Sequence, residues 1–257
     1  YRGYDSSGIS ILSKGELSSW KKAGKINELG KLLSGMTINA QIGIGHTRWA
    51  THGIANDINS HPHNNRNNKV SVVHNGIIEN YLEIKKSLID EGYIFRSETD
   101  TEVIVHLIEK HLNGSVRHAV IKALETVTGS YAIAVIAENN PDKIIIAKKG
   151  SPILIGCGEN ENFISSDMNA LLPHTQNIIY LEDNQIGEIT KEKITLYNTN
   201  DKEVEKKVHT INWNPSSAGK EGYEHFMIKE IYEQPTVIRN ILSKYISNKN
   251  EIEFNKL

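Results

Sequence analysis

The chain has 257 residues, a length that suits one large domain or one domain with an appendage. Its 29 Lys and Arg residues nearly balance 31 Asp and Glu residues, so the formal net charge of -2 gives no electrostatic reason to expect nucleic acid or an anionic membrane as a partner. A single cysteine, Cys157, excludes an internal disulfide framework and predicts a reducing, cytoplasmic compartment. The longest apolar runs fall far short of the roughly 20 residues that span a bilayer.

The first part of the sequence predicts a hairpin, a short helix and a strand. Two β-rich runs lie within residues 7–25, on either side of the turn residues Lys14 and Gly15. Apolar residues at helical spacing over 26–33 predict a helix, and the alternating run 41–46 predicts a further strand.

A long polar loop is predicted between residue 46 and residue 68, before another β-rich run at 70–74. This segment is rich in Asn, His and Pro and has little periodicity. Because a loop longer than about 12 to 15 residues inside a compact domain is usually functional, we expect chemistry here first.

Three helices are predicted next. The first covers residues 79–91 and ends at Gly92, which supplies a left-handed stop. The second begins at a capping box formed by Thr99 and Glu102, and the third covers 116–124.

From residue 129 to about residue 208, short β-rich runs alternate with turn clusters, which predicts a β-meander. Helices segregated from such strands indicate the α+β class. A polar linker then leads to an amphipathic stretch that Pro235 interrupts. Its apolar face has little chain to pack on, so we expect residues 1–215 to form one domain and 216–257 to be the linker and first helical segment of a second, absent domain.

Five of the 11 histidines gather in one stretch: His46, His52, His61, His63 and His74. None of these pairs has the helical i, i+4 spacing of a zinc-binding HExxH motif, although His61 and His63 flank a proline and could chelate a metal from a loop. The plainer interpretation is a polar loop whose histidines form hydrogen bonds with the backbone.

Four motifs suggest a third interpretation. They are Tyr-Arg-Gly-Tyr-Asp-Ser at 1–6, His-Thr-Arg-Trp-Ala-Thr-His-Gly at 46–53, His-Asn-Gly-Ile-Ile-Glu-Asn at 74–80 and Ser-Glu-Thr-Asp-Thr-Glu at 97–102. In this order they closely resemble the class II glutamine amidotransferase domain of the glucosamine-6-phosphate synthase family. Glu-Ile-Tyr-Glu-Gln-Pro at 230–235 resembles the passage into that family's sugar-phosphate isomerase domain. The likeness covers nearly the whole chain.

The resemblance implies a site for free glutamine. Arg48 would pair with the α-carboxylate through its planar fork, and Trp49 beside it would wall the pocket. Without its neighbours, Arg48 would be interpreted as an exposed loop arginine. Asp100 would hold the α-ammonium, although the dipole of the predicted helix also accounts for an acidic residue at that position.

The resemblance assigns the oxyanion hole to the Asn75 side-chain amide and the Gly76 backbone N–H, each donor being worth roughly 3 to 4 kcal/mol. By themselves, Asn75 and Gly76 would be interpreted as a plain turn. Gly76 would also contact glutamine, and the loop after residue 46 would close over it. The other residues that the resemblance places at or near this pocket are Thr51, His52, His61 and Arg2.

The family's nucleophile is a cysteine at the mature N-terminus, whose own α-amine is the base. This sequence opens at Tyr1, so we expect that cysteine, with a first strand and helix, to precede it. Cys157 is internal and is expected in a buried strand as a core residue. The resemblance therefore implies a four-layer αββα sandwich of the N-terminal-nucleophile hydrolase type that lacks its first strand and helix, with no glutaminase turnover from these residues alone.

For the parent enzyme, the resemblance implies that ammonia from L-glutamine converts fructose 6-phosphate into glucosamine 6-phosphate. It implies no metal and no redox cofactor, and a homodimer that assembles through the absent isomerase domain. Two alternatives stay open. One is another class II amidotransferase, such as amidophosphoribosyltransferase, against which residues 230–235 argue. The other is a non-catalytic glutamine-binding or regulatory module that begins at Tyr1.

Overall fold

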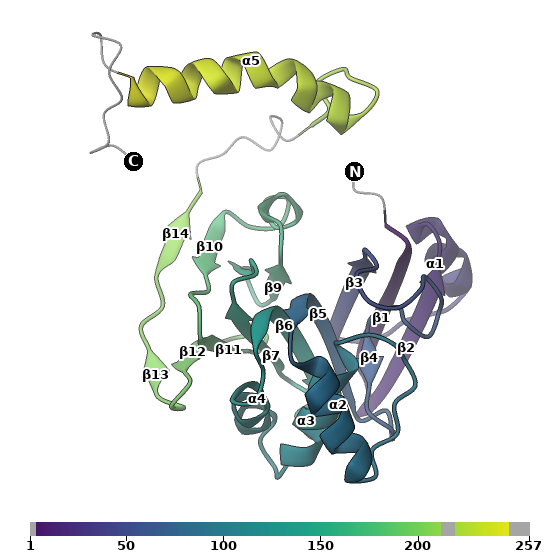
Figure 1. Ribbon diagram of the computed structural model, residues 1–257. Helices are drawn as coiled ribbons and strands as arrows, with labels where there is room; N and C mark the ends of the chain where they lie inside the picture. Colours follow the sequence, from purple (N-terminus) through teal and green to yellow (C-terminus); the bar gives the residue numbers. More distant parts are fainter. Residues whose placement is uncertain (1–3, 212–218, 247–257) are drawn as a thin grey trace. The chain divides into compact units, whose positions relative to one another are not determined.

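The computed structural model describes residues 4–211 and 219–246 (Figure 1). Backbone contacts divide the chain into two compact units, one covering residues 3–212 and the other containing residues 213–257. No helix within the described ranges is long and apolar enough to cross a membrane.

The larger unit begins with a three-stranded antiparallel sheet of order β2-β1-β3. The hairpin turn at Lys14 and Gly15 is confirmed, and both residues have positive φ, 53° and 83°. Its strands and the helix that follows are β1 (Ser6–Ser13), β2 (Glu16–Ala23), α1 (Ile26–Leu33) and β3 (Ile42–Arg48). The predicted elements of this region are therefore all present.

A seven-stranded antiparallel sheet forms the centre of the same unit, in the order β13-β12-β11-β7-β6-β5-β4. Its strands are β4 (His63–Asn64), β5 (Val70–Ile78), β6 (Gly129–Ala137), β7 (Ile144–Lys149), β11 (Gln185–Ile189), β12 (Ile194–Asn198) and β13 (Glu203–Val204). Seven consecutive residues of β6, from 131 to 137, are buried. A strand that is covered on both faces has apolar residues at consecutive positions, as β6 does.

A third sheet has four strands in the order β14-β10-β8-β9. These are β8 (Leu154–Cys157), β9 (Asn162–Ser165), β10 (Asn177–Tyr180) and β14 (Val208–Thr210), with the short 3-10 helix η1 (Met168–Ala170) between β9 and β10. The predicted β-meander is therefore wrong, because the chain leaves the central sheet after β7 and returns to it at β11. Turn signals locate strand ends, whereas the choice of partner strand depends on long-range packing.

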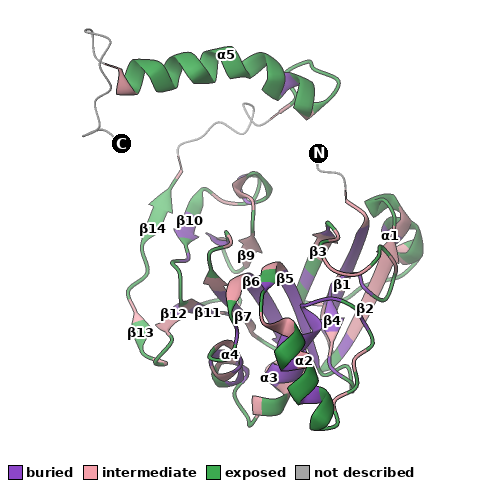
Figure 2. Ribbon diagram, in the orientation of Figure 1, coloured by how far each residue is buried: buried purple, intermediate pink, exposed green. Residues whose placement is uncertain are grey.

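Three helices cover one face of the central sheet: α2 (Tyr81–Asp90), α3 (Glu102–His111) and α4 (Val116–Leu124) (Figure 1). Seven consecutive residues of α3, from 102 to 108, are buried (Figure 2). Both smaller sheets contribute residues to the core on the opposite face, including Ile44 of β3 and Ile155 of β8 against Ile146 of β7. The fold is thus mixed α and β, which is consistent with the α+β prediction.

The predicted capping box is wrong. The residue that caps α3 is Thr101, with no side-chain cap, and the Thr99 hydroxyl instead lies 3.1 Å from His63 Nε2. The Glu102 carboxylate accepts hydrogen bonds from the backbone N–H groups of Arg96 and Ser97, at 2.8 Å and 2.6 Å. Tertiary hydrogen bonds to these side chains replace the local cap.

The smaller unit contains α5 (Phe226–Tyr245), which runs through Pro235 without a break. The predicted interruption at that residue is therefore wrong. A proline removes one intrahelical hydrogen bond, that to the carbonyl four residues earlier. Here that residue is Ile231, which is 53% exposed, so water can satisfy the carbonyl. Lys229 is the buried residue of α5, and its Nζ donates to the Gly219 carbonyl at 2.7 Å.

Candidate functional site

Buried polar residues gather where the end of β3, the middle of β5 and the turn before α3 approach one another. Arg48, His74 and Asp100 are each 4% exposed, and His61 is 5% exposed. Since burial of a polar group without a partner is unfavourable, the partners of these residues define the site.

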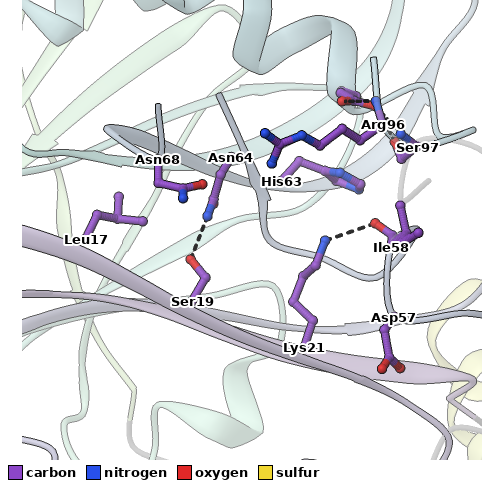
Figure 3. Close-up of a pocket in the computed structure, with 11 residues that line it drawn as sticks. Leu17, Ser19, Lys21, Asp57, Ile58, His63, Asn64, Asn68, Arg96 and Ser97 are labelled. Carbon is purple, nitrogen blue, oxygen red and sulfur yellow. Dashed lines mark hydrogen bonds between the residues drawn. The ribbon is translucent and has the colours of Figure 1, made fainter. Parts of the chain in front are cut away.

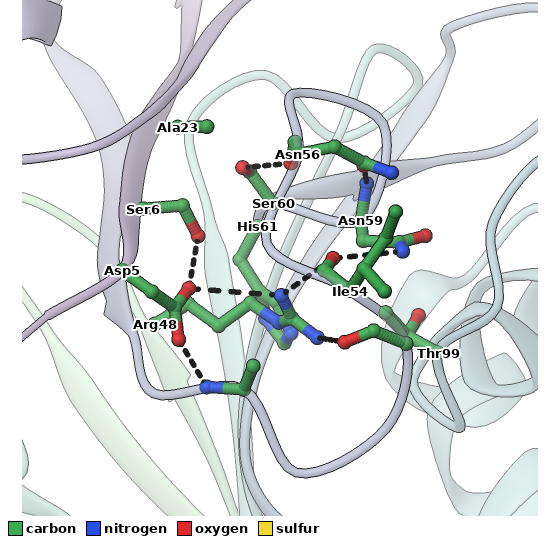
Figure 4. A network of polar contacts seen from close by, with 12 residues as sticks. Asp5, Ser6, Ala23, Arg48, Ile54, Asn56, Asn59, Ser60, His61 and Thr99 are labelled. Atoms are coloured by element: carbon green, nitrogen blue, oxygen red, sulfur yellow. Dashed lines mark hydrogen bonds and ion pairs between the residues drawn. The ribbon is translucent and has the colours of Figure 1, made fainter.

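Arg48 ends β3, and its guanidinium is already held by the chain (Figure 4). Nη2 donates to the carbonyls of His52, at 2.5 Å, and Gly53, at 3.1 Å, and Nη1 lies 3.5 Å from the Ile54 carbonyl. The interpretation of Arg48 as an exposed loop arginine is therefore wrong. The loop that follows β3 curls back over this side chain.

Asp5, the residue before β1, supports the same arginine. One carboxylate oxygen lies 3.6 Å from Arg48 Nη1 and accepts a hydrogen bond from the Ser6 hydroxyl at 2.9 Å, and the other accepts from the backbone N–H of Ala50 (Figure 4). The carboxylate thus ties the start of β1 to both ends of the Arg48-to-Ala50 segment.

Asp100 lies two residues before α3, not within its first turn. Its Oδ2 accepts a hydrogen bond from the backbone N–H of Ile78 at 2.8 Å, which anchors the carboxylate to β5. Its Oδ1 lies 3.9 Å from His52 Nδ1, a nitrogen with no hydrogen-bond partner in the described part of the chain. His52 therefore links Arg48 and Asp100, because its carbonyl accepts a hydrogen bond from Arg48 and its ring faces the Asp100 carboxylate.

Asn75 and Gly76 lie inside β5, opposite Ala132 and Tyr131 of β6. The interpretation of this pair as a turn is wrong, because β6 provides a full-length partner for the strand. Gly76 has φ 136°, and a Cβ there would lie 2.1 Å from the Ser130 carbonyl oxygen. Only glycine fits at this point of the strand.

His46 of β3 reaches across to Asn75, with His46 Nε2 and Asn75 Oδ1 2.7 Å apart. Burial lowers the pKa of His46, more than its contact with Asn75 raises it, so the ring is neutral at pH 7. Its Nδ1 is buried and has no partner among the described residues. A neutral ring with its proton on Nε2 satisfies the contact with the amide oxygen.

His61, His63 and His74 form a packed group with His46. The rings of His46 and His61 stack with centroids 4.3 Å apart, and His63 meets His61 edge-on at 4.8 Å. Burial lowers the pKa of His63 to about 3 and that of His74 to about 4, so both are neutral at pH 7. His74 Nδ1 lies 2.9 Å from the Thr101 hydroxyl.

No group of three or more His, Cys, Asp or Glu residues in the described ranges is arranged to hold a metal ion. The hydrogen bonds of His46, His61, His63 and His74 go to Asn75, threonine hydroxyls and the backbone. The arrangement fits the interpretation of hydrogen-bonded structural histidines better than that of a zinc site.

The loop after β3 is fastened to the turn before α3 through Asn59 and Glu98. Asn59 Nδ2 donates to Glu98 Oε2 and to the Ile54 carbonyl, both at 3.0 Å, and Asn59 Oδ1 accepts from the Glu98 backbone N–H at 3.0 Å. In contrast, Trp49 is 67% exposed and Thr51 is also exposed. The part of the loop nearest Arg48 thus has its largest side chain in solvent.

Arg2, which sequence reasoning placed near the nucleophile, lies outside the described residues. Cys157 ends β8 and is half-buried, and burial raises the pKa of its thiol. A raised pKa disfavours the thiolate, which agrees with a structural role for this cysteine.

Residues 11–223 match the family described as "Glutamine amidotransferase domain". The chain belongs to this family.

Curated relatives of this amidotransferase domain share close to half of its residues. The chain is 49% identical over 254 residues to the glutamine--fructose-6-phosphate aminotransferase (isomerizing) of Aquifex aeolicus, and 47% identical over 252 residues to that of Caldanaerobacter subterraneus. These matches cover 99% and 98% of the chain but only 43% and 41% of the two relatives. The chain thus spans less than half the length of the curated relatives it matches.

Solved structures support the fold of this amidotransferase domain. The glutamine phosphoribosylpyrophosphate amidotransferase from B. subtilis, complexed with ADP and GMP, aligns with a TM-score of 0.65 over 77% of this chain and 43% of that one. A second structure, described as the allosteric regulatory enzyme of purine biosynthesis, aligns with a TM-score of 0.66 over the same shares. Both are 24% identical to this chain, so they indicate the fold alone.

Sequence reasoning did not assign roles to several residues that hold this site together. Asp5 and Glu98 lie within the motifs at 1–6 and 97–102. Their membership of these motifs could have indicated that they belong to the site. His46 opens the second motif, whereas Asn59 lies in the polar loop with nothing to distinguish it from its neighbours. Its role depends on a contact 39 residues away in the sequence.

Proposed function

We propose that this chain is the glutamine-hydrolysing half of an enzyme that transfers ammonia from L-glutamine. The observation that carries the proposal is the link from Arg48 to Asp100 through His52, together with the link from His46 to Asn75. These contacts bring a guanidinium, a carboxylate and an amide from separate strands and loops into one region. Free glutamine requires those three groups, since it has an α-carboxylate, an α-ammonium and an amide to be attacked.

Asp100 binds the α-ammonium of glutamine. Its Oδ2 is occupied by the Ile78 N–H, which fixes the orientation of the carboxylate and leaves Oδ1 on the side of His52. A buried carboxylate held in this way forms charge-assisted hydrogen bonds without reorganisation when the substrate arrives.

Arg48 binds the α-carboxylate after an exchange of partners. Its Nη2 is occupied by the carbonyls of His52 and Gly53, so the segment after Trp49 must shift before the fork can take a carboxylate. The carboxylate then replaces neutral carbonyl acceptors with charged ones, which strengthens the hydrogen bonds. Binding of glutamine is thereby coupled to movement of the segment that carries Trp49, Thr51 and His52, which closes over the substrate.

The oxyanion hole consists of the Asn75 amide N–H and the Gly76 backbone N–H. His46 donates to Asn75 Oδ1, which turns the amide nitrogen of Asn75 away from His46 and towards the substrate. His46 is therefore a positioning residue for an oxyanion donor. His61, stacked on the His46 ring, keeps that ring in place.

The nucleophile is a cysteine upstream of Tyr1. Its thiolate attacks the amide carbon, and the oxyanion that forms is held by Asn75 and Gly76. The cysteine's own α-amine takes the thiol proton before the attack and returns it to the departing nitrogen. Collapse of the intermediate thus expels ammonia and leaves a thioester, which water hydrolyses to glutamate and the free cysteine. On this account the 257 residues alone release no glutamate.

We assign the fold to the αββα sandwich of N-terminal-nucleophile hydrolases. The helices α2 to α4 on one side of the central sheet, the smaller sheets on the other side and α1 packed on β2 support this assignment. β3 is an edge strand among the described strands, and the first strand of the complete sandwich pairs beside it. The missing helix follows that strand.

Residues 1–215 form the glutaminase domain, and 216–257 are the linker and first helical segment of a sugar-phosphate isomerase domain. The exposed apolar side chains of α5 support this division, since Ile231, Ile238 and Ile241 are each more than half exposed. In the complete protein, that domain accepts the ammonia and converts fructose 6-phosphate into glucosamine 6-phosphate in the cytoplasm, as a homodimer. The names of the relatives at 45–49% identity support this acceptor over that of amidophosphoribosyltransferase.

The test is to extend the chain upstream with its natural coding sequence and to measure release of glutamate from glutamine. We expect glutamate release from the extended protein and none after the first cysteine is replaced by alanine. Absence of glutamate release from the extended protein would overturn the enzyme proposal. If that protein still bound glutamine, the non-catalytic binding module would replace it.

A further inference from the structure

A second pocket opens beside β2 (Figure 3). It has a volume of about 420 Å³, which lies within the range of about 300 to 1,000 Å³ typical of small-molecule sites. Its walls come from β2, from the loop at residues 57–58, from β4 and from the segment before α3. None of Arg48, Asn75 and Asp100 lines it.

The two acidic residues of this pocket are already bound by the chain. Asp57 receives a hydrogen bond and ion pair from Lys22 Nζ at 2.8 Å and a hydrogen bond from the Ala23 backbone N–H at 2.7 Å. Glu102 accepts from the Arg96 backbone N–H and from both the N–H and hydroxyl of Ser97. Neither carboxylate therefore needs a cation from a ligand.

The two cationic side chains of the pocket have few partners. Lys21 Nζ donates to the Ile58 carbonyl at 2.9 Å, which leaves two of its three N–H groups. The Arg96 guanidinium makes no hydrogen bond and no ion pair with the described residues, although it lines the pocket together with His63 (Figure 3). Seven N–H groups of these two side chains are thus available to a ligand.

The β4 wall of the pocket carries an acceptor without a donor. Asn64 donates through Nδ2 to the Ser19 hydroxyl at 2.8 Å, while its Oδ1 is buried and has no hydrogen-bond partner in the part of the chain that the structure describes. An unsatisfied buried acceptor is unfavourable by about 1 to 3 kcal/mol, and a hydroxyl group of a ligand would relieve it.

We propose that this pocket binds a small phosphate monoester that bears hydroxyl groups, at a site separate from the glutamine pocket. The phosphate pairs with Lys21 as a point charge and with the planar fork of Arg96, which suits two oxygens at once. A hydroxyl of the ester donates to Asn64 Oδ1 once the amide, which is buried before binding, turns towards the ligand. The ligand is thus held from β2, β4 and the segment that leads into α3, and its binding joins these three parts of the unit.

Protonation of Lys21 makes this binding depend on pH. Burial, with repulsion from Arg48 and Arg96, lowers the pKa of Lys21 to about 8 despite attraction from Glu102 and Asp57. A phosphate dianion stabilises the charged form, so it binds best below that pKa and more weakly as pH rises through it.

The experiment is a calorimetric titration of the chain with glycerol 3-phosphate at pH 7 and low ionic strength. We expect Lys21→Gln and Arg96→Gln each to weaken binding at least tenfold. The matched controls are Lys86→Gln on α2 and Arg66→Gln in the loop after β4, which remove the same charges from exposed positions outside the pocket and change binding less than twofold. Thermal melting of every variant separates lost binding from lost folding.

Three further titrations sharpen the result. Between pH 7 and pH 9.5, binding to the natural chain weakens, while binding to Lys21→Gln does not change. Glycerol 3-phosphate binds more tightly than inorganic phosphate because only the ester reaches Asn64, and equal affinities would overturn the hydroxyl contact. Saturating glutamine leaves the titration unchanged, and competition by glutamine would overturn the claim of a separate site.

The proposal as a whole fails if glycerol 3-phosphate does not bind, or if the control variants weaken binding as much as Lys21→Gln and Arg96→Gln. The second result would indicate attraction to the surface in general, not to this pocket. Because glutamate release plays no part in these measurements, they fail or succeed independently of the proposed glutaminase activity.

Discussion

Two polar regions of the larger unit differ in how far their charged groups are already paired. In the proposed glutamine site, Arg48 and Asp100 are buried, and both form hydrogen bonds with the backbone. In the pocket beside β2, the carboxylates are paired, but Arg96 is exposed and its guanidinium has no partner among the described residues.

The difference follows from the energetics of burial. A charge taken out of water requires partners inside the protein, so a buried binding group is also a structural group. An exposed cation is solvated and needs no such partner, so it can bind a ligand without contributing to the fold. Substitutions in the buried region should therefore change both stability and function, whereas substitutions of the exposed cation should change binding only.

The largest expected effect concerns Glu102. Burial alone would raise the pKa of this carboxyl, but hydrogen bonds from His106, Ser97 and the Arg96 backbone together lower it from 4.5 to about 2. A lowered folded-state pKa contributes stability that is present above pH 4.5 and lost as pH falls towards 2. We expect Glu102→Gln to lower the free energy of unfolding by roughly 3 kcal/mol at pH 7.

Denaturant unfolding of Glu102→Gln and of the natural chain at pH 7 and pH 3 measures this contribution. The difference in stability should shrink at pH 3, because the Glu102 carboxyl of the unfolded natural chain, with its ordinary pKa of 4.5, is then largely protonated, which favours unfolding. Glu83→Gln, on the exposed face of α2, provides the matched control. A difference that stays constant between the two pH values would show that the charge of Glu102 contributes nothing.

The next effect concerns Asp100. Replacement by Asn keeps an oxygen that can accept from the Ile78 N–H but removes the charge that the α-ammonium requires. We expect Asp100→Asn to weaken glutamine binding about 100-fold, or roughly 2.7 kcal/mol, in a calorimetric titration. Asp90→Asn, an exposed change on α2, should leave the affinity unchanged. Equal affinities for Asp100→Asn and the natural chain would remove Asp100 from the pocket.

A smaller effect is expected at His46, which acts through Asn75. In the extended protein with its cysteine, His46→Ala should lower kcat about 10- to 100-fold and leave KM for glutamine nearly unchanged, because the oxyanion donor loses its orientation. His46→Gln, whose amide N–H can replace Nε2–H, should restore part of kcat. A parallel rise in KM would instead indicate a general disturbance of the pocket.

The smallest effect on stability is expected at Arg96. Its guanidinium is solvated, so Arg96→Gln should change the free energy of unfolding by less than about 0.5 kcal/mol while it weakens phosphate-ester binding at least tenfold. Denaturant unfolding measures the first quantity. A loss of several times that size would mean that Arg96 belongs with the buried, paired groups, and the contrast between the two regions would fail.

The sequence by itself determined the local elements and the chemistry of the motifs. The turn residues Lys14 and Gly15 predicted the first hairpin, and both have positive φ in the structure. The spacing of apolar residues predicted the three helices that cover the central sheet. The ordered motifs with Arg48, Asn75 and Asp100 were sufficient to predict the family. These features depend on residues that are near one another in the chain, so they can be predicted from the sequence pattern.

Only the tertiary structure decided which segments pair and which side chains are already occupied. The sequence alone indicates a turn at Asn75 and Gly76, whereas the structure pairs them with β6. The sequence likewise indicates a helix cap at Thr99, whereas the Thr99 hydroxyl contacts His63. The exit of the chain from the central sheet after β7, and the carbonyls that hold Arg48, likewise depend on contacts that spacing along the chain does not reveal. Strand pairing and burial are cooperative properties of the whole unit. Each backbone or charged group that is buried must find a hydrogen-bond partner, and that partner can lie far away in the sequence.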